Sequence, residues 1–556
     1  FDHNPSTGES LGLLIEEQRT NLNPYSNTGF SEAGVQRFAG LAPDGTYTAA
    51  LLTNSNATNG NYTSPGAGTF TLSIFVKQGT SSTFSLQWAG YGGTDWIFTF
   101  STATLSLNNG TGSVWSNGIV QQYSGGWYKL SATTSNRALY YYGFAADSST
   151  SNFYFWGHQV EVGSFPTSYI PTPATFTSRA SSATYYDASG VIQTAGTNVA
   201  RSAAFFPDSN GVMRSAGLLL EAAGTNLLTY SEQFDNAAWR KTTSTITANS
   251  AAAPDGTTTA DLLYPNSTGT LRYMDVNASI SSSVTTMSFF VKAAGFARCY
   301  LVGGGTSIAA WFDLSAGTVG TVASGCTAFI QKLANGWFRC SLTQPATAVP
   351  YASIGPCDAD NSFTATASGT NGIYIWGAQL EASSYATSYI PTTTSTVTRS
   401  ADVRSSATVT RSADVASITG SNFSSWYNNS AGTIFASLIN GNSSQANSIW
   451  SFDNGTSSSR IMFRIGIGTQ ITGFDTLSDT SIPYTAKHAF AISNNDLSGA
   501  KNGNLYTLPV NKSTMPSVTE LLFGNGPGVG AACATISLFT YWPTRLSNAT
   551  LQAITA

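Results

Sequence analysis

The chain of 556 residues is short of charge, because Asp, Glu, Lys and Arg make up 9% of it, against about 25% in an ordinary soluble protein. The net charge is −4, and no cluster of Lys and Arg occurs that could bind a phosphate backbone. Apolar runs such as residues 138–146 are about half as long as a membrane span. We therefore expect neither nucleic-acid binding nor membrane insertion.

Cysteine and histidine are also scarce, with five cysteines and three histidines. An odd number of cysteines without a C-x-x-C pair argues against a disulfide framework and against a zinc site. We interpret the cysteines as buried thiols of a protein made in a reducing cytoplasm.

Glycine, aromatic residues and small polar residues are abundant instead, with 53 glycines and 12% aromatic residues. Thr, Tyr, Phe and Val favour strands, while Gly and Asn favour tight turns. The composition therefore predicts an all-β protein, and the length predicts about three domains.

One phrase occurs twice, at a distance of 205 residues. Gly12–Ser26 reads GLLIEEQRTNLNPYS, and Gly217–Ser231 reads GLLLEAAGTNLLTYS. Further matching blocks follow in the same order, and the last pair begins at Trp156 and at Trp376. Matched blocks in a fixed order indicate two homologous domains.

The matched blocks alternate with a period of two, as in Tyr374–Glu381, which predicts strands. Roughly eight to ten short strands in each copy, separated by Gly, Asn and Ser turns, predict sandwiches of the jelly-roll type. The last 140 or so residues match neither copy but alternate again. We predict a third, different β-sandwich there.

Two segments outside the sandwiches have patterns of their own. Residues 185–195, YYDASGVIQTA, predict a hairpin with a glycine turn. The phrase TRSADV occurs at Thr398–Val403 and again at Thr410–Val415, which we interpret as an extended linker with a local duplication. The alignment of the two copies places Phe1 opposite Phe206, so we expect more chain before Phe1.

The phrases GLLIEEQRTNL, APDGT, WGAQLE, SYIPT and TRSADV together resemble tail-fibre and head-fibre proteins of tailed bacteriophages and prophages. The third domain is similar to concanavalin A-like sandwiches, with YWPTRLSNATLQAIT as a closing strand and a short C-terminal helix. Ser547 or Asn548 is expected to cap that helix, with Leu551 and Ile554 facing the sheet.

The predicted fold class is therefore all-β, with three β-sandwich domains in tandem, of which the first two are homologous jelly rolls and the third is concanavalin A-like. We predict a connector (a partial repeat) at 1–12, sandwich copy 1 at 13–176, a hairpin-containing linker at 177–216, sandwich copy 2 at 217–397, a linker at 398–416 and the third sandwich at 417–556.

The resemblance implies a non-enzymatic head-fibre or tail-fibre protein on the virion surface, assembled in the cytoplasm of the bacterial host. It implies a homo-oligomer, with a trimer favoured, that joins other virion proteins through a segment upstream of Phe1 and contacts bacterial surface polysaccharide. The alternative is a set of non-catalytic carbohydrate-binding modules from a secreted carbohydrate-active enzyme or polysaccharide depolymerase.

Candidate catalytic residues are few. GESLG at Gly8–Gly12 fits the pattern of a nucleophile elbow, but neither the strand before it nor the helix after it is expected. Glu16 and Glu17 are adjacent on an expected strand and would point to opposite faces. Glu161 and Glu381 recur in both copies, where pairing with Arg or capping of backbone amides is the plainer role.

Aromatic side chains are the natural candidates for glycan contact, because a flat ring stacks on the apolar face of a sugar. Tryptophans shared by both copies are predicted to be core residues: Trp96 with Trp311, Trp127 with Trp337, and Trp156 with Trp376. Trp88 and Tyr91 align with Gly303 and Thr306, so we predict that they form an exposed contact surface, with packing against a neighbouring domain or subunit as the alternative. Trp115 and Tyr141 are weaker candidates.

No cofactor is predicted, although calcium would suit a lectin-like third domain. Asp453 in DNG and Asp496 in NNDLSG could supply oxygen ligands. Such Asx-Gly clusters are mostly turns, so both residues are weak candidates for a metal site.

Overall fold

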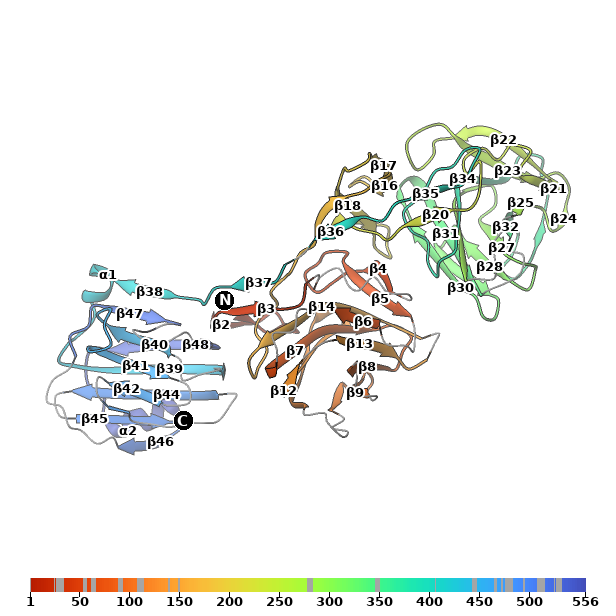
Figure 1. Ribbon diagram of the computed structural model, residues 1–556. Coiled ribbons are helices and arrows are strands. Elements are labelled where there is room, and N and C mark those ends of the chain that lie inside the picture. The colour runs from red at the N-terminus through yellow and green to blue at the C-terminus, as the bar shows by residue number, and fades with distance from the viewer. Residues whose placement is uncertain are drawn as a thin grey trace. The chain divides into compact units, whose positions relative to one another are not determined.

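Nearly every element of the computed structural model is a strand, so the protein is all-β, as predicted (Figure 1). Within the described residues, helix is confined to α1 (Ser421–Ser424), α2 (Asn548–Thr555) and two single 3-10 turns. No helix in that part of the chain is long and apolar enough to cross a membrane. The structure describes residues 2–24, 26, 35–53, 58–61, 67–88, 94–107, 115–138, 141–148, 151–277, 284–345, 351–405, 407–442, 448–464, 468–471, 474–475, 484–493, 496–507, 516–524, 526 and 533–556.

The chain divides into two compact units, each of which gathers segments that are far apart in the sequence. Unit 1 comprises Phe1–Asn27, Ser55–Thr172 and Ala407–Ala556, and unit 2 comprises Thr28–Asn54 and Pro173–Ser406. We predicted domains that are consecutive blocks of the sequence, and these boundaries stay a prediction.

The larger part of unit 2 is a sandwich of two antiparallel six-stranded sheets, built by the second repeat copy. The first sheet has the order β21-β25-β32-β27-β28-β29, and the second has the order β22-β23-β34-β26-β31-β30. The first sheet consists of β21 (Arg240–Thr242), β25 (Tyr273–Asn277), β27 (Arg298–Val302), β28 (Ala309–Asp313), β29 (Thr318–Val322) and β32 (Tyr351–Pro356). The second consists of β22 (Ser244–Ala251), β23 (Ala260–Pro265), β26 (Thr285–Ala294), β30 (Thr327–Lys332), β31 (Trp337–Gln344) and β34 (Gly372–Glu381).

Alternation along each strand decides which side chains enter the core of this sandwich. In β27, Cys299 and Leu301 lie in the core between the sheets, whereas Tyr300 and Val302 belong to a separate cluster on the other face. Full burial of a side chain such as Leu301 stabilises the fold by about 1.5–3 kcal/mol. The first sheet therefore has two apolar faces, and its outer face carries aromatic residues.

The hairpin-containing linker before the second copy, which we call the connector from here on, folds into a small sheet with the order β17-β16-β18-β19. Its strands are β16 (Ala183–Tyr186), β17 (Ile192–Ala195), β18 (Arg201–Pro207) and β19 (Met213–Leu219). β16 and β17 form the predicted hairpin, with Gly190 at a φ of 77° in its turn. Phe38 and Tyr47, from the hairpin of β4 (Val35–Gly40) and β5 (Ala49–Thr53), stack on Phe206 with ring centroids 5.5 and 5.9 Å apart.

Unit 1 contains the corresponding strands of the first copy. One sheet includes β11 (Trp115–Gln122), β12 (Trp127–Ala138), β7 (Ala67–Gln78) and β14 (Asn152–Val162), paired in that order. A second has the order β10-β9-β8-β13-β6, with β6 (Thr58–Asn61), β8 (Thr83–Trp88), β9 (Thr94–Thr99), β10 (Thr104–Leu107) and β13 (Tyr141–Ala146). The shared tryptophans are buried in both copies, which confirms that they are core residues: Trp96, Trp127, Trp156, Trp311, Trp337 and Trp376.

The C-terminal part of unit 1 forms the third sandwich. One sheet has the order β1-β2-β48-β39-β44-β45-β46, with β1 (Asp2–His3), β2 (Ser10–Ile15), β39 (Ala431–Asn442), β44 (Tyr484–Ser493), β45 (Asp496–Lys501), β46 (Asn504–Thr507) and β48 (Cys533–Trp542). The other has the order β38-β47-β40-β41-β42-β43, with β38 (Ala416–Thr419), β40 (Ser448–Asp453), β41 (Arg460–Arg464), β42 (Gly468–Ile471), β43 (Phe474–Asp475) and β47 (Glu520–Phe523).

The short C-terminal helix α2 covers the outer face of one of these sheets. The Ser547 hydroxyl accepts the N–H of Thr550 at 3.2 Å, so Ser547 is the N-cap, one of the two predicted candidates. Leu551 is fully buried and Ile554 packs against the same cluster as Phe435, which confirms the predicted apolar side of the helix.

Both TRSADV segments are extended, as predicted, and each is integrated into a unit by strand pairing. β35 (Val397–Arg399) pairs with β20 (Gly224–Asn226) in unit 2. β37 (Val409–Arg411) pairs in the same way with β3 (Arg19–Asn21) in unit 1. Each TRSADV segment thus lies beside the matching phrase of one repeat copy.

Candidate functional site

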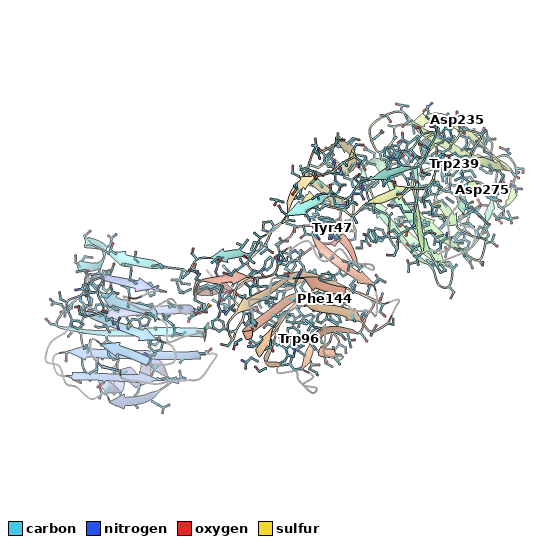
Figure 2. All side chains as sticks on the ribbon, in the orientation of Figure 1. Tyr47, Trp96, Phe144, Asp235, Trp239 and Asp275 are labelled. Carbon is cyan, nitrogen blue, oxygen red and sulfur yellow. The ribbon has the colours of Figure 1, made fainter. Side chains whose placement is uncertain are left out.

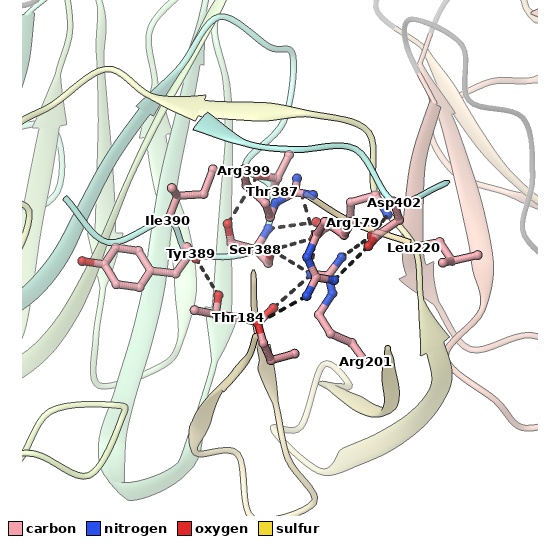
Figure 3. A network of polar contacts seen from close by, with 12 residues as sticks. Arg179, Thr184, Arg201, Leu220, Thr387, Ser388, Tyr389, Ile390, Arg399 and Asp402 are labelled. Atoms are coloured by element: carbon pink, nitrogen blue, oxygen red, sulfur yellow. Dashed lines mark hydrogen bonds and ion pairs between the residues drawn. The ribbon is translucent and has the colours of Figure 1, made fainter. Parts of the chain in front are cut away.

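A cluster of charged side chains is buried in unit 2, where the connector, the second copy and the first TRSADV segment meet (Figure 3). We call it the arginine–carboxylate cluster, and its members are Arg179, Arg201, Glu221, Arg399 and Asp402. The side chain of each member is at most 14% exposed. Charged groups are rarely buried without partners, so the contacts decide what this cluster can do.

Asp402 lies at the centre of the arginine–carboxylate cluster. Its Oδ1 is 2.9 Å from Nη1 of Arg179, and its Oδ2 is 2.5 Å from Nη2 of Arg201. Oδ2 also accepts the backbone N–H of Glu221 at 2.8 Å, while the Asp402 N–H donates to the Glu221 carbonyl at 2.9 Å. One carboxylate therefore joins both ends of the connector to the segment that follows the second copy.

Arg179 is held on the opposite side by the turn that precedes β18. Its Nη2 donates to the carbonyls of Gly196 and Val199 at 2.9 and 3.0 Å, and its Nε donates to the carbonyl of Ser181 at 2.8 Å. These bonds use the planar guanidinium as a fixed set of donors, which lysine cannot reproduce. Arg179 thus fixes the path of the connector as well as balancing charge.

Glu221 is the second carboxylate of the cluster. Its Oε2 is 2.6 Å from Nη1 of Arg201 and 3.7 Å from Nη2 of Arg399, and its Oε1 accepts the N–H of Ser388 at 2.9 Å. Burial alone would raise the pKa of Glu221, but Arg399, Arg201 and the Ser388 donors outweigh it and hold the pKa well below its usual range.

This arrangement suits attachment of segments rather than proton transfer. A general acid or base needs a pKa near the working pH, whereas Glu221 stays ionised far below neutral pH. Arginine does not release its proton in proteins. The five residues come from segments more than 200 positions apart, so their ion pairs hold these segments in one unit.

Unit 1 contains a related but smaller set of contacts around the first copy. Asp414 Oδ2 accepts the N–H of Glu16 at 3.0 Å, and the Asp414 N–H donates to the Glu16 carbonyl at 2.9 Å. Glu16 Oε1 accepts the N–H of Ser168 at 2.7 Å, and its Oε2 pairs with Arg411. Glu16, Arg411 and Asp414 therefore occupy the positions of Glu221, Arg399 and Asp402.

A second candidate site lies on the outer face of the first sheet of the unit 2 sandwich. Four side chains project from this face, as the strand registers require: Tyr273 and Asp275 of β25, Tyr351 of β32 and Arg240 of β21. We call these four residues the tyrosine platform. Figure 2 labels Asp275 at this position in the fold. Both tyrosines are half-buried and contact the aromatic cluster behind them.

Arg240 and Asp275 form the charged centre of the tyrosine platform. Arg240 Nε is 2.9 Å from Asp275 Oδ1, and Nη2 pairs with Oδ2, so the contact is bidentate. The Asp275 side chain is 1% exposed, whereas that of Arg240 is 66% exposed. The guanidinium is therefore fixed in orientation and still open to solvent.

The rest of this outer face is covered. Tyr300 and Trp311 are buried beside Phe363, with ring centroids of 4.9 Å in each pair, and the Trp311 Nε1–H donates to the Ser362 carbonyl at 2.8 Å. Gly355 permits this packing, because a Cβ there would lie 2.5 Å from Tyr300 Oη. Away from the tyrosine platform, the rings of Tyr300 and Trp311 are therefore enclosed.

The predicted glycan contacts in the first copy have different outcomes. Trp88 ends β8 and Tyr141 begins β13, but their side chains, like the whole of Tyr91, lie outside the described residues. Trp115 was expected as a weak surface candidate, yet it is 3% exposed and packs edge-on against Trp96 with centroids 5.0 Å apart. Its ring has no free face for a sugar, so this expectation is wrong.

The two weak metal candidates have protein partners. The fully buried Asp453 accepts the Ser451 hydroxyl at 2.6 Å and the N–H of Gly455 at 2.9 Å, which makes it a turn residue. Asp496 pairs with Arg545 Nε at 2.9 Å. No group of three or more metal-ligating His, Cys, Asp or Glu side chains occurs among the described residues. Calcium binding stays a prediction.

The carboxylates considered for catalysis are engaged in the fold. Glu161 and Glu381 accept the backbone N–H of Thr167 and Thr387 at 3.0 and 2.8 Å, which confirms amide capping. Glu16 and Glu17 follow the end of β2 and are buried, so their expected place on a strand was wrong.

The nucleophile-elbow pattern is not realised either. Ser10 begins strand β2, and the residues after it continue that strand instead of starting a helix. The motif therefore lacks the strand–turn–helix geometry on which its chemistry depends.

Sequence reasoning missed both candidate sites. Tyr351 stands 210 positions after Tyr141, in the strand that corresponds to β13, so the sequence alignment contained the signal for one platform residue. The sequence also contained a signal for the arginine–carboxylate cluster, because TRSADV occurs twice and so does the phrase that begins at Gly12 and at Gly217. Nothing local indicated that their charges meet.

No family model matches the chain, and no curated protein matches it. Among solved structures, the chain is similar to the N-terminal CBM22-1-CBM22-2 tandem domain of Xyn10C from Paenibacillus barcinonensis, with 11% identity over 68% of this chain and 99% of that chain. The TM-score is 0.20, and a likeness this low supports no argument about fold or function.

Proposed function

We propose that the chain is a non-catalytic structural subunit on the surface of a tailed-phage particle, in a head fibre or tail fibre, and that its tyrosine platform contacts bacterial surface polysaccharide. The tyrosine platform is the observation that carries glycan binding. The phrases shared with phage fibre proteins support the place on the particle, where the chain would associate with further copies of itself and with other virion proteins.

The chemistry of the tyrosine platform suits a sugar. Half-buried Tyr273 and Tyr351 offer ring surface to the apolar face of a pyranose, and their hydroxyls can bond to sugar hydroxyls. The bidentate pair with Asp275 fixes Arg240, which can then donate to a hydroxyl or to an acidic sugar with little loss of side-chain entropy.

A non-catalytic role agrees with the use of the carboxylates. Glycosidases place two carboxyl groups about 5–10 Å apart across the scissile bond. On the tyrosine platform the single carboxylate, Asp275, is buried beneath Arg240 and already paired with it. Asp275 is therefore not available as the free acid or base that hydrolysis needs.

Binding can be tested with the full chain on a microarray of bacterial surface polysaccharides, followed by calorimetry with the best ligand. We expect Tyr351→Ala and Tyr273→Ala each to weaken binding at least about 10-fold, since ring stacking is worth on the order of 1–2 kcal/mol. Phe329→Ala is the matched control, because Phe329 is 52% exposed on the other sheet of the same sandwich. Undiminished binding by the double tyrosine variant would refute the platform.

The place on the particle needs a separate measurement. Purified phage particles are imaged with gold-labelled antibody against residues 400–556, beside particles without the antibody. Label on projecting fibres is the expected result, and its position decides between head and tail. Protein found free in the medium, with bare particles, would instead favour modules of a secreted carbohydrate-active enzyme or depolymerase.

A further inference from the structure

The bidentate contact of the tyrosine platform uses only one edge of the Arg240 guanidinium. Nε and Nη2 of Arg240 donate to the two oxygens of Asp275. A guanidinium has five N–H donors in a fixed plane, so two donors on Nη1 and one on Nη2 remain. These three donors have no partner within the described part of the chain. The end of the guanidinium formed by Nη1 and Nη2 is therefore open to a ligand.

The burial of the two side chains directs the charge of Arg240 outward. The side chain of Arg240 is more exposed than that of any other arginine in an ion pair of the described residues. Its partner Asp275 is buried, and both oxygens of Asp275 are engaged. A ligand that approaches from solvent therefore meets N–H donors and positive charge first. The contact with Asp275 also holds these donors in place, which lowers the entropy lost on binding.

The strand registers place Arg240 in the middle of the tyrosine platform. Arg240 lies opposite Asp275 in the pairing of β21 with β25. Tyr351 lies opposite Asn277 in the pairing of β32 with β25. Tyr273 stands two positions before Asp275 and Asn277 two positions after it, which is about 7 Å of strand in each direction. The row of Arg240 therefore lies halfway between the rows of the two tyrosines.

On the basis of the proposed glycan binding, we infer that the ligand of the tyrosine platform is an acidic polysaccharide, and that one of its uronic acid sugars lies over Arg240. The two carboxylate oxygens of that sugar accept from Nη1 and Nη2, in the parallel geometry that guanidinium and carboxylate groups prefer. Sugars on either side of it stack on Tyr273 and Tyr351. The strands therefore order the contacts along the glycan as ring, charge and ring.

A carboxylate suits this end of the guanidinium better than a sugar hydroxyl does. The hydroxyl is a neutral acceptor, whereas the carboxylate brings two oxygens and a negative charge. Hydrogen bonds between charged groups are about twice as strong as those between neutral groups. A neutral glycan leaves part of the Arg240 donors to water, so the platform selects an acidic glycan by the contacts that a neutral one cannot make.

The ligand side of the inference can be tested without any change to the protein. Acidic bacterial surface polysaccharides are printed beside the same polymers after carbodiimide activation and borohydride reduction, which converts each carboxylate into a primary alcohol and keeps the linkages. The full chain is applied to both, and calorimetry measures its affinity for the best pair of polymers. We expect reduction of the carboxylates to weaken binding at least about 5-fold.

Two arginine variants test the protein side. Arg240→Gln keeps a donor for Asp275 but removes the charge and the open end of the guanidinium, so it should bind the acidic and the reduced polymer about equally. Arg298→Gln is the matched control, because Arg298 is a partly exposed, ion-paired arginine on β27 of the same sheet. It should keep the preference of the unchanged chain. A preference that survives Arg240→Gln, or that both variants abolish, would overturn the inference.

The same measurements separate this inference from the proposed function. Binding that depends on Tyr273 and Tyr351 but is equally strong with the reduced polymers would overturn the acidic ligand and leave glycan binding intact. Binding to no polymer, or binding that the double tyrosine variant retains in full, would overturn the proposed glycan binding and this inference with it.

Discussion

Substitution of Asp402 by Asn is the sharpest test of the arginine–carboxylate cluster. The change keeps the size of the side chain but removes a charge that lies 2.9 and 2.5 Å from two arginines without exposed surface. Removal of one partner from a buried ion pair costs about 3–5 kcal/mol, because the other charge stays buried and uncompensated. Here Arg179 keeps its carbonyl partners and Arg201 keeps Glu221, so we expect the lower part of that range.

The matched substitution in unit 1 is Asp414→Asn. An amide oxygen can still accept the Glu16 N–H, and no arginine is bound to Asp414 in the described part of the chain, so the cost should stay below about 1 kcal/mol. For units of this size a loss of 1 kcal/mol lowers the Tm by about 2 °C. We therefore expect a drop of about 6–8 °C for Asp402→Asn and less than about 2 °C for Asp414→Asn.

Differential scanning calorimetry of the full chain can measure both shifts, and hydrogen exchange can assign each thermal transition to unit 1 or unit 2. Equal, small shifts in the two variants would refute the reasoning, because they would mean that the arginines of the connector do not depend on Asp402. A shift of the unit 1 transition in the Asp402 variant would refute it as well.

Three further predictions follow from individual side chains. Burial lowers the pKa of His488 from its usual 6.5 to about 4, so the folded state resists its protonation and unit 1 should lose stability as the pH falls from 6.5 to 4. Burial lowers the pKa of His158 in the same unit to about 3, so His488→Gln should reduce this dependence, but not abolish it, in thermal melts at stepped pH. Trp115→Ala should lower the stability of unit 1 by about 3–5 kcal/mol in denaturant titrations, whereas a preserved stability would mean that its ring is not packed in solution. Ser547→Ala should cost about 1 kcal/mol through loss of the N-cap of α2, and an unchanged Tm would show that the N-cap hydrogen bond does not contribute to stability.

The strands could be predicted from the sequence because the alternation of residues along each strand can be read from consecutive positions. In Tyr374–Glu381 the alternation predicts a strand, and the structure has one there. It does not predict one continuous core face, because the pairing with β26 shifts register between Trp376 and Gln379, so that Ile375 and Leu380 share a core while Trp376 lies in another cluster. The repeat identified core tryptophans, since a buried position such as that of Trp376 cannot change freely. Local pattern and repeat therefore predicted the fold class.

The candidate sites could not be predicted in this way, because they depend on registers between distant segments. Asp402 and Arg179 are 223 positions apart, and each alone reads as a surface charge. Tyr273 and Tyr351 are on one face only because β25 and β32 pair in the observed register. The expectation for Trp115 failed for a related reason, since only the position of Trp96 shows that this ring is enclosed.

The pairing of β2 with β48 has a consequence for biosynthesis. Leu13 lies opposite Ile536. β2 is synthesised early, and it can pair with β48 only after more than 500 further residues have been synthesised. Until then Ile15 lacks part of its core, and the edges of β2 and β39 stay open to other chains. Contacts of such long range form slowly, and we expect unit 1 to be the part of the nascent chain that depends most on chaperones.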